Sequence, residues 1–197
     1  ETYVKAMERN HLESEFLQGV ICVHKSEFKN AQAHIDRARE LLDAELTALV
    51  GESYSRAYRI IVQAQQLAEL EEVIMYKQSE SPVERAHIRK MWNQRLQGCQ
   101  RNVDVWQQVL EVRSLVVSPE EDIPTWLSFS SLCRKSGRLA LSLDILHNLM
   151  GQDVDVYVSR YEAKAGSAPA INLAALTVIR YPEVNYALLK HMWAVGY

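Results

Sequence analysis

The sequence predicts an all-α protein in which antiparallel helix pairs stack as an α-solenoid of the tetratricopeptide or HEAT type. Three observations lead to this prediction. Strong helix formers (Leu, Ala, Glu, Gln and Arg) dominate the 197 residues. Only 7 Gly and 5 Pro interrupt them, which is too few for the many turns of a β-rich chain. Apolar residues recur every three or four positions between short polar turns, as in successive antiparallel helices.

The first part of the chain contains three expected helices. A short apolar helix covers residues 16–24, and a polar turn follows at residues 25–27. The second helix carries one apolar stripe and ends before Gly51, where a C-terminal cap is expected. The third runs from about residue 52 to residue 77. The second stripe consists of Phe28, Ala31, Ile35, Ala38, Leu42, Leu46 and Leu49, and the third of Tyr54, Tyr58, Ile61, Ala64 or Gln65, Ala68, Val73 and Tyr76.

Two later helix starts share the pattern Ser-Pro-x-Glu. At Ser81 and at Ser118 the serine is the expected N-cap, the proline takes the first helical position, and the glutamate can reach back to the cap. The stretch 83–117 is too long for one ordinary helix, so a break is expected at residues 98–102. Ser118 with its proline also matches a proline-directed phosphorylation site, but capping already accounts for both residues.

The second half continues the pattern. A helix is expected from Ser118 through Trp126 to about Arg134, followed by a turn at residues 135–137 and a partner helix that ends at Met150. Short turns make each helix the antiparallel neighbour of the one before it.

The stretch 152–180 loses the periodicity. It contains Gly166 and Pro169, and we expect a connecting loop or insertion there. Gly151 closes the helix before it, and Pro182 opens the last expected helix.

Segments 26–42 and 136–150 both look like the second helix of a repeat, with a short turn followed by Ala or Leu at helical spacing. One helix pair cannot bury its apolar stripe alone, so such pairs stack on their neighbours. Residues 1–197 are therefore expected to be part of one helical-repeat region, cut from a longer protein.

The sequence contains no recognisable catalytic or metal-binding motif. Its six histidines form neither HExxH nor a pair four residues apart, and no glycine-rich phosphate-binding loop is present. Cys22, Cys99 and Cys133 include no CxxC pair, so we expect buried free thiols in a reducing compartment. The residues themselves give no reason to expect a metal ion or another cofactor.

The charge pattern also limits the partners. The net charge is −3 and no block of five basic residues occurs, so a nucleic-acid partner is not expected. The longest stretch without a charged residue is 165–179, which is shorter than the roughly 20 apolar residues of a membrane span.

Clustered acids and tryptophans receive structural interpretations. Glu69, Glu71 and Glu72 are expected on solvated helix faces, and the acidic run 120–122 at a helix start, where the helix dipole favours negative charge. The tryptophans are expected to anchor the packing between helices. They are Trp92, Trp106, Trp126 and Trp193.

One polar set has a functional interpretation. In a curved array the helix ends of successive repeats line one edge, and cations there can hold a polyphosphate, because Arg offers bidentate contacts and Lys a point charge. The alternative is dispersed surface charge with salt bridges. The set consists of Arg95, Arg101, Arg134, Lys135, Arg138 and Lys190.

Several long runs are more specific than any spaced motif. They are Gly51-Glu52-Ser53-Tyr54-Ser55-Arg56-Ala57-Tyr58, Leu70-Glu71-Glu72-Val73-Ile74, Arg95-Leu96-Gln97-Gly98-Cys99-Gln100-Arg101, Arg113-Ser114-Leu115-Val116-Val117-Ser118-Pro119 and Lys135-Ser136-Gly137-Arg138-Leu139-Ala140-Leu141. These runs resemble the FAT region of the target of rapamycin (TOR) kinases, members of the phosphatidylinositol 3-kinase-related kinase family.

The resemblance implies a non-catalytic scaffold segment that clamps the kinase domain of the same chain. It implies partners among the subunits of a TOR complex and a role in nutrient-controlled growth signalling. The active site of such a serine/threonine kinase would lie elsewhere in the parent protein. The implied location is the cytoplasm, including endomembrane surfaces reached through complex partners.

The resemblance also implies a ligand, because related FAT regions hold inositol hexakisphosphate in a basic pocket. The matching positions in this chain are Arg101 and Lys135. Two further lysines of the family pocket align with Ser128 and Ala194, so this chain lacks those two cations.

Two other functions stay open at this point. The chain could be a free-standing tetratricopeptide-like adaptor that binds peptides in its concave groove. It could also be an enzyme with an unrecognised helical fold. An adaptor predicts polar capping helices at both ends, whereas the apolar ends of this chain favour a fragment of a larger array.

Overall fold

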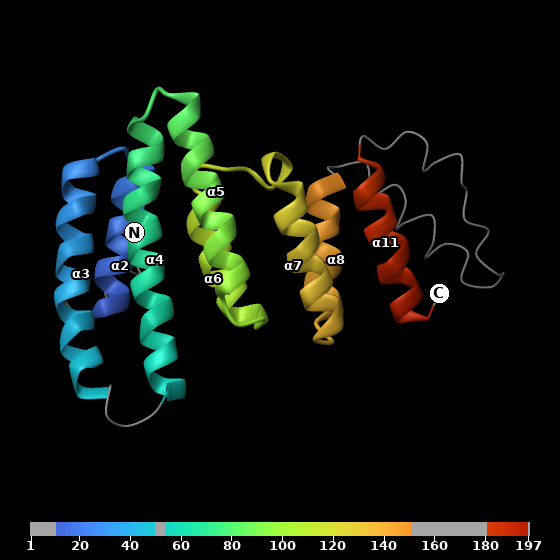
Figure 1. Ribbon diagram of the computed structural model, residues 1–197, viewed down its shortest axis with the longest axis horizontal. Coiled ribbons are helices and arrows are strands. Elements are labelled where there is room, and N and C mark those ends of the chain that lie inside the picture. Colours follow the sequence, from blue (N-terminus) through green and yellow to red (C-terminus); the bar gives the residue numbers. More distant parts are fainter. Residues whose placement is uncertain (1–10, 50–53, 151–180, 197) are drawn as a thin grey trace. The chain divides into compact units, whose positions relative to one another are not determined.

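Every element in the described residues is helical, as Figure 1 shows for residues 11–49, 54–150 and 181–196 of the computed structural model. The predicted all-α class is therefore confirmed. The chain divides into two compact units. The first contains residues 1–100 and 104–117, and the second contains residues 101–103 and 118–197.

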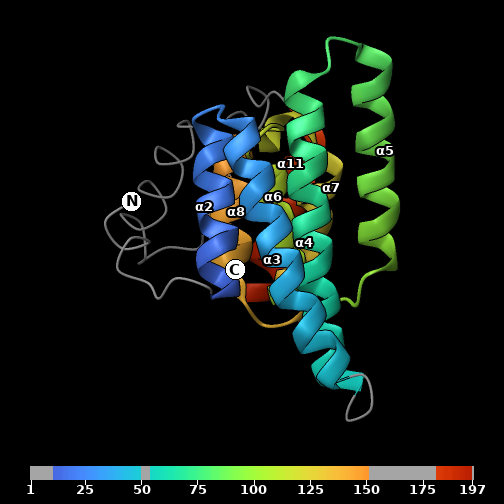
Figure 2. The ribbon, with the colours of Figure 1, turned by 90° about the vertical axis from the view of Figure 1, so that its left-hand side faces the viewer.

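The first unit is built from antiparallel neighbours. Its helix α3 packs against both α2 and α4, and α4 also contacts α5 (Figures 1 and 2). Consecutive helices run in opposite directions, as the short turns predict. The elements are α2 (Leu12–His24), α3 (Phe28–Leu49), α4 (Tyr54–Gln78), α5 (Pro82–Gly98) and α6 (Val103–Arg113). The expected break at residues 98–102 is confirmed as the turn between α5 and α6.

The predicted stripe of α3 is confirmed wherever the structure describes its side chains. Ala31, Ile35, Ala38 and Leu42 are buried, and Phe28 packs against the same core with Leu46. This helix buries a single face, so the spacing of its apolar residues is enough to identify that face.

The predicted stripe of α4 is partly wrong. Ile61 is 49% exposed, whereas Ile60, Leu67 and Leu70 are buried. The reason is that α4 has neighbours on several sides, since it packs against α2, α3 and α5. A helix with several buried faces does not follow the periodicity of one stripe.

Ser81 caps α5 as predicted, but the reciprocal half of the cap is indirect. Its Oγ accepts a hydrogen bond from the backbone N–H of Glu84 at 3.4 Å. The N–H of Ser81 donates to Ser79 Oγ at 3.2 Å, and Ser79 Oγ donates to the Glu84 carboxylate at 2.6 Å. Ser79 thus stands between the two partners of an ordinary capping box.

Helices α2 and α7 end in turns with the same hydrogen bonds. After α2 the N–H of Ser26 donates to Val23 O, and the N–H of Glu27 donates to Cys22 O. After α7 the N–H of Gly137 donates to Arg134 O, and the N–H of Arg138 donates to Cys133 O. Both are Schellman motifs, with a residue of positive φ just past the helix.

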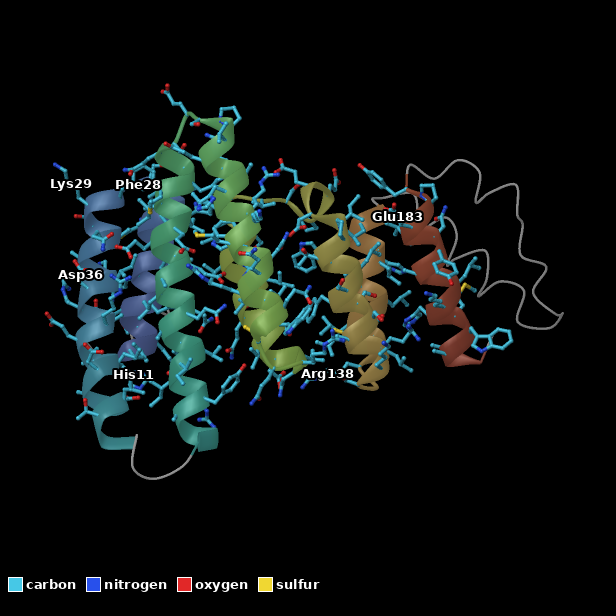
Figure 3. All side chains as sticks on the ribbon, viewed as in Figure 1. His11, Phe28, Lys29, Asp36, Arg138 and Glu183 are labelled. Carbon is cyan, nitrogen blue, oxygen red and sulfur yellow. The ribbon has the colours of Figure 1, made fainter. Side chains whose placement is uncertain are left out.

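The second unit contains a short 3₁₀ turn and three described helices. These are η1 (Pro119–Glu121), α7 (Ile123–Lys135), α8 (Leu139–Met150) and α11 (Pro182–Val195). Helix α8 packs against α7 and α11, and η1 contacts both α7 and α8. Figure 3 places Arg138 at the α7–α8 turn and Glu183 at the other end of this unit, where α11 begins.

The predicted helix start at Ser118 is wrong. Ser118 makes no capping hydrogen bond and precedes only the three residues of η1. The α-helix begins at Ile123, after Asp122, whose Oδ1 accepts a hydrogen bond from Thr125 Oγ1 at 2.8 Å. Asp122 also makes no side-chain hydrogen bond to the backbone, but Pro124 in the first turn favours a helix start at this place.

Two of the tryptophans are not the buried anchors that the sequence predicts. Trp92 and Trp106 are buried, but Trp126 is half-buried and Trp193 is 84% exposed. Three other predictions, the caps at Gly51 and Gly151 and the loop at 152–180, lie outside the described residues.

Candidate functional site

Two of the three acids of α4 are not on solvated faces, which corrects the sequence prediction for Glu69 and Glu72. Glu69 is fully buried, and the side chains of Glu72 and Glu71 are 14% and 36% exposed. Each carboxylate binds an arginine of a different helix. These three residues therefore tie α4 to α6, to α5 and to α3.

The innermost pair joins Glu69 to Arg113 at the end of α6. Arg113 Nε donates to Glu69 Oε2 at 2.7 Å, and Arg113 Nη2 donates to Oε1 at 2.8 Å. The same Nη2 also donates to the Trp92 carbonyl at 2.8 Å, and the guanidinium lies 5.7 Å from the centre of the Trp92 ring. This forked geometry compensates two buried charges, which otherwise lose several kcal/mol of hydration each.

The second pair joins Glu72 to α5. Arg95 donates from both terminal nitrogens to the two carboxylate oxygens, each at 2.7 Å. Trp92 Nε1 donates to the same carboxylate at 2.7 Å. The hydrogen bond to Glu72 raises the pKa of Arg95. Because these contacts join α5 to α4, Arg95 stabilises the packing of the two helices. This ion pair is the salt-bridge alternative that the sequence left open for Arg95.

The third pair lies nearer the surface and joins Glu71 to α3. Arg39 Nη2 donates to Glu71 Oε2 at 2.5 Å, and Gln32 Nε2 donates to Oε1 at 3.1 Å. The hydrogen bond from Arg39 lowers the pKa of Glu71, and the same bond raises the pKa of Arg39. The α4 carboxylate thus stays charged over the ordinary pH range.

Sequence reasoning missed the burial of Glu69, although one signal was present. Glu69 stands between Leu67 and Leu70, and Arg113 directly follows Val112. A charged residue inside an apolar run is buried only when it is paired. That rule predicts a partner of opposite charge, but it does not say which helix supplies it.

The other expected cations have varied surroundings. Arg101 and Lys135 are exposed and belong to the same compact unit. Lys190 Nζ lies 3.9 Å from the centre of the Tyr186 ring, a cation–π contact on α11. Arg134 is half-buried. The pairing of Arg101 with Lys135 in a ligand site stays a prediction.

A polar cluster at the core of the second unit was not expected from the sequence. Ser130 of α7 lies 2.9 Å from Ser142 of α8, oxygen to oxygen. His191 Nδ1 of α11 lies 3.2 Å from the same Ser142 Oγ. Burial lowers the pKa of His191, and the charges of Arg134 and His147 lower it further.

This Ser–His contact does not make a nucleophile. Ser142 is fully buried and His191 is 4% exposed, so no substrate reaches the hydroxyl. The cluster instead satisfies polar groups where three helices meet. Within the described ranges no group of His, Cys, Asp and Glu side chains could hold a metal ion.

The thiols of the chain are free where the structure describes them. Cys133 is fully buried, and burial raises the pKa of its thiol to about 11. Cys22 and Cys99 are only half-buried, which differs from the prediction for those two residues. No helix among the described residues has the length and apolar character to cross a membrane.

Comparison with known proteins places these helices in a family. A family model described as FAT domain matches residues 1–197. The chain belongs to the FAT domain family. The resemblance seen in the sequence runs is therefore confirmed. Those runs contain Glu72, Arg95 and Arg113, which in this FAT domain form the ion pairs between α4 and its neighbours.

Several TOR kinases are similar to this FAT chain. It is 44% identical over 195 residues to serine/threonine-protein kinase TOR2 of Saccharomyces cerevisiae. It is 43% identical over 192 residues to serine/threonine-protein kinase mTor of Drosophila melanogaster, and 41% identical over 186 residues to serine/threonine-protein kinase TOR of Arabidopsis thaliana. The alignments cover 98%, 98% and 92% of this chain, but only 7% of each relative.

Proposed function

We propose that this FAT chain is a non-catalytic helical scaffold segment of a TOR serine/threonine protein kinase. In this role it clamps the kinase domain of the same parent chain and supports assembly with the other subunits of a TOR complex in nutrient and growth signalling. The parent kinase would act in the cytoplasm, or at endomembrane surfaces reached through its partners. The observation that carries the proposal is the similarity to TOR kinases over 98% of the chain.

The packing of the first unit supports a scaffold role. The carboxylates of Glu69 and Glu72 are used to hold helices together, and neither is free to accept a substrate proton. Bidentate pairs of this kind fix the angle between helices, which suits a segment that must keep a defined shape.

The outer face of α11 supports a contact with another part of the parent kinase. Tyr186 and Trp193 are 61% and 84% exposed, and Leu189 beside them is 37% exposed. These residues recur at helical spacing, so they form one face of α11. An exposed aromatic face of this kind is typical of a surface that packs against protein.

A chimaeric kinase tests the scaffold proposal. This chain would replace the matching segment of the budding-yeast relative, to which it is 44% identical. We expect the purified chimaera to transfer phosphate to a protein substrate. A second chimaera with an unrelated helical-repeat segment of equal length is expected to be inactive. An inactive, folded chimaera that carries this chain would contradict the proposal.

The non-catalytic part of the proposal has its own test. The isolated chain is expected to transfer no radiolabelled phosphate from ATP to a protein substrate, because it has no recognisable phosphate-binding loop or metal-binding acid pair. Transfer that persists through purification and is stopped by an ATP-site inhibitor would show that the segment is an enzyme.

We also propose that Arg101 and Lys135 contribute to a site for inositol hexakisphosphate. The support is the resemblance to family pockets, the exposure of both side chains and their place in one compact unit. An arginine and a lysine bind phosphate through complementary fork and point-charge contacts. The other family lysines are absent here at Ser128 and Ala194, so weak and salt-dependent binding is expected.

Calorimetry at low salt measures this binding. The double variant Arg101→Glu/Lys135→Glu is expected to lose most of the affinity. The control Lys29→Glu/Arg59→Glu changes the charge equally at two exposed positions of the first unit. Equal losses in the two variants would show that only diffuse attraction acts, and would contradict a site at Arg101 and Lys135.

A further inference from the structure

The two Ser-Pro dipeptides of the chain have the same sequence pattern but different structures. Ser81-Pro82 and Ser118-Pro119 are both followed by a glutamate three residues after the serine. The sequence contains no other Ser-Pro and no Thr-Pro dipeptide. The structure nevertheless gives their hydroxyl groups different tasks.

Ser81 is committed to the start of α5. Its Oγ accepts the N–H of Glu84, and its own N–H donates to Ser79 Oγ. Ser79 is held in turn by the carboxylate of Glu84. A kinase could reach Ser81 Oγ only after this network and the first turn of a 17-residue helix had opened.

Ser118 has none of these restraints. Its side chain is exposed and makes no capping hydrogen bond, and only a three-residue 3₁₀ turn follows (η1, yellow in Figure 1). Its backbone is extended, with φ −69° and ψ 154°. Pro119 favours this extended conformation of the residue before it. Ser118 is a single extended residue between a hydrogen-bonded turn at residues 114–117 and η1. Its hydroxyl is therefore exposed without the opening of an α-helix.

We propose that Ser118, and not Ser81, is a phosphate-acceptor site for a proline-directed protein kinase that acts on this chain. In the reaction Ser118 Oγ attacks the γ-phosphorus of ATP, the bond to the β-phosphate oxygen breaks, and ADP leaves. The hydroxyl proton passes to the catalytic carboxylate of that kinase. The dipeptide selects the proline-directed class, because Pro119 has no N–H to donate to the kinase.

The modification would act on a segment that already carries negative charge. Phosphate adds up to about two negative charges at neutral pH. Glu120 and Asp122 follow closely, and η1 contacts α7 and α8. Repulsion between the phosphate and these carboxylates is expected to destabilise the 3₁₀ turn η1. Ser118 is the residue at which the segment 118–197 of the second unit begins.

The test compares both serines in the folded 197-residue chain with matched peptides. Peptides of residues 75–88 and 112–125 place Ser81 and Ser118 at the same position, and a proline-directed kinase that modifies both at similar rates is used with ATP. Mass spectrometry then follows each site in the folded chain. For each serine the rate in the folded chain is divided by the rate in its peptide. This ratio is expected to be at least about tenfold higher for Ser118 than for Ser81, because only Ser81 must leave a helix cap.

Three variants check the assignment. Ser118→Ala and Pro119→Ala are expected to abolish most incorporation into the folded chain. Ser79→Ala, which weakens the cap network at Ser81, is expected to raise modification of Ser81 and leave that of Ser118 unchanged. Equal normalised rates at the two serines, or a folded chain that is inert at Ser118 while the peptide reacts, would overturn the proposal.

Discussion

Ser26 and Gly137 hold the same position in two turns of the same geometry. Their φ angles are 62° and 78°, and each turn closes with the same pair of backbone hydrogen bonds. Both segments were expected from sequence to begin the second helix of a repeat. Glycine adopts positive φ without steric cost, whereas serine has a Cβ that opposes it.

The pair predicts opposite effects of substitution. Ser26→Gly is expected to raise the free energy of unfolding by about 0.5–1 kcal/mol, because glycine has no Cβ and avoids the steric cost of the left-handed conformation. Gly137→Ala is expected to lower it by about 1 kcal/mol for the same reason. Urea unfolding measures both. Destabilisation by Ser26→Gly would mean that the serine side chain stabilises the turn in another way.

The buried ion pair gives the largest expected loss. Glu69→Ala leaves the guanidinium of Arg113 buried without its carboxylate and is expected to cost about 3–5 kcal/mol of unfolding free energy. The double variant Glu69→Leu/Arg113→Met removes both charges and is expected to recover most of that loss. Urea midpoints of the single and double variants decide between these outcomes.

Glu71→Ala is the matched control for that experiment. Its carboxylate is 36% exposed and pairs with Arg39, which is 39% exposed. Exposed pairs contribute little, so a loss of about 1 kcal/mol or less is expected. A loss equal to that of Glu69→Ala would show that burial is not what sets the cost.

The low pKa of His191 predicts that the stability of the folded chain depends on pH. Its pKa in the folded chain lies below the ordinary value of 6.5, first because of burial and then because of Arg134 and His147. The unfolded chain therefore binds a proton more readily, and stability is lost as the pH falls below about 6.5 toward the folded-state pKa.

The measurement is the unfolding free energy between about pH 7.5 and about pH 5.5, a range that brackets the ordinary histidine pKa. His191→Gln is expected to reduce the slope in this range, while His24→Gln, at an exposed position, keeps it. An unchanged slope in His191→Gln would assign the pH dependence to other groups.

The two aromatic residues Trp92 and Trp126 are expected to differ. Trp92 is buried, stacks on Tyr76 at 5.8 Å between ring centres and donates to Glu72, so Trp92→Ala is expected to cost about 3–5 kcal/mol. Trp126 is half-buried against Phe129, and about 1–2 kcal/mol is expected from the smaller area that it covers. Chemical denaturation of both variants measures the difference.

Helix existence and order could be predicted from the sequence because they depend on local features. Periodic apolar residues identified α3, and proline at the first position identified the starts of α5 and α11. The α-helix start predicted at Ser118 was wrong because two nearby positions, Ser118 and Asp122, both match the sequence pattern of a helix start. Asp122 and Pro124, a few residues on, supply the start that the chain uses.

The candidate site was harder to predict because its pairs join distant parts of the chain. Glu69 and Arg113 are 44 residues apart, and no periodicity says which faces of α4 and α6 meet. The partner of Arg95 could not be identified from the sequence for the same reason. The family resemblance carried the functional inference, since the residues alone show a helical protein without a recognisable catalytic motif.

The placement of the three acids on α4 has a mechanical consequence. Successive residues of an α-helix are rotated by about 100°, so Glu69, Glu71 and Glu72 project in three directions around the axis. Each is fastened to a different neighbour. A roll of α4 in either sense would pull all three contacts out of line together, so α4 resists torque.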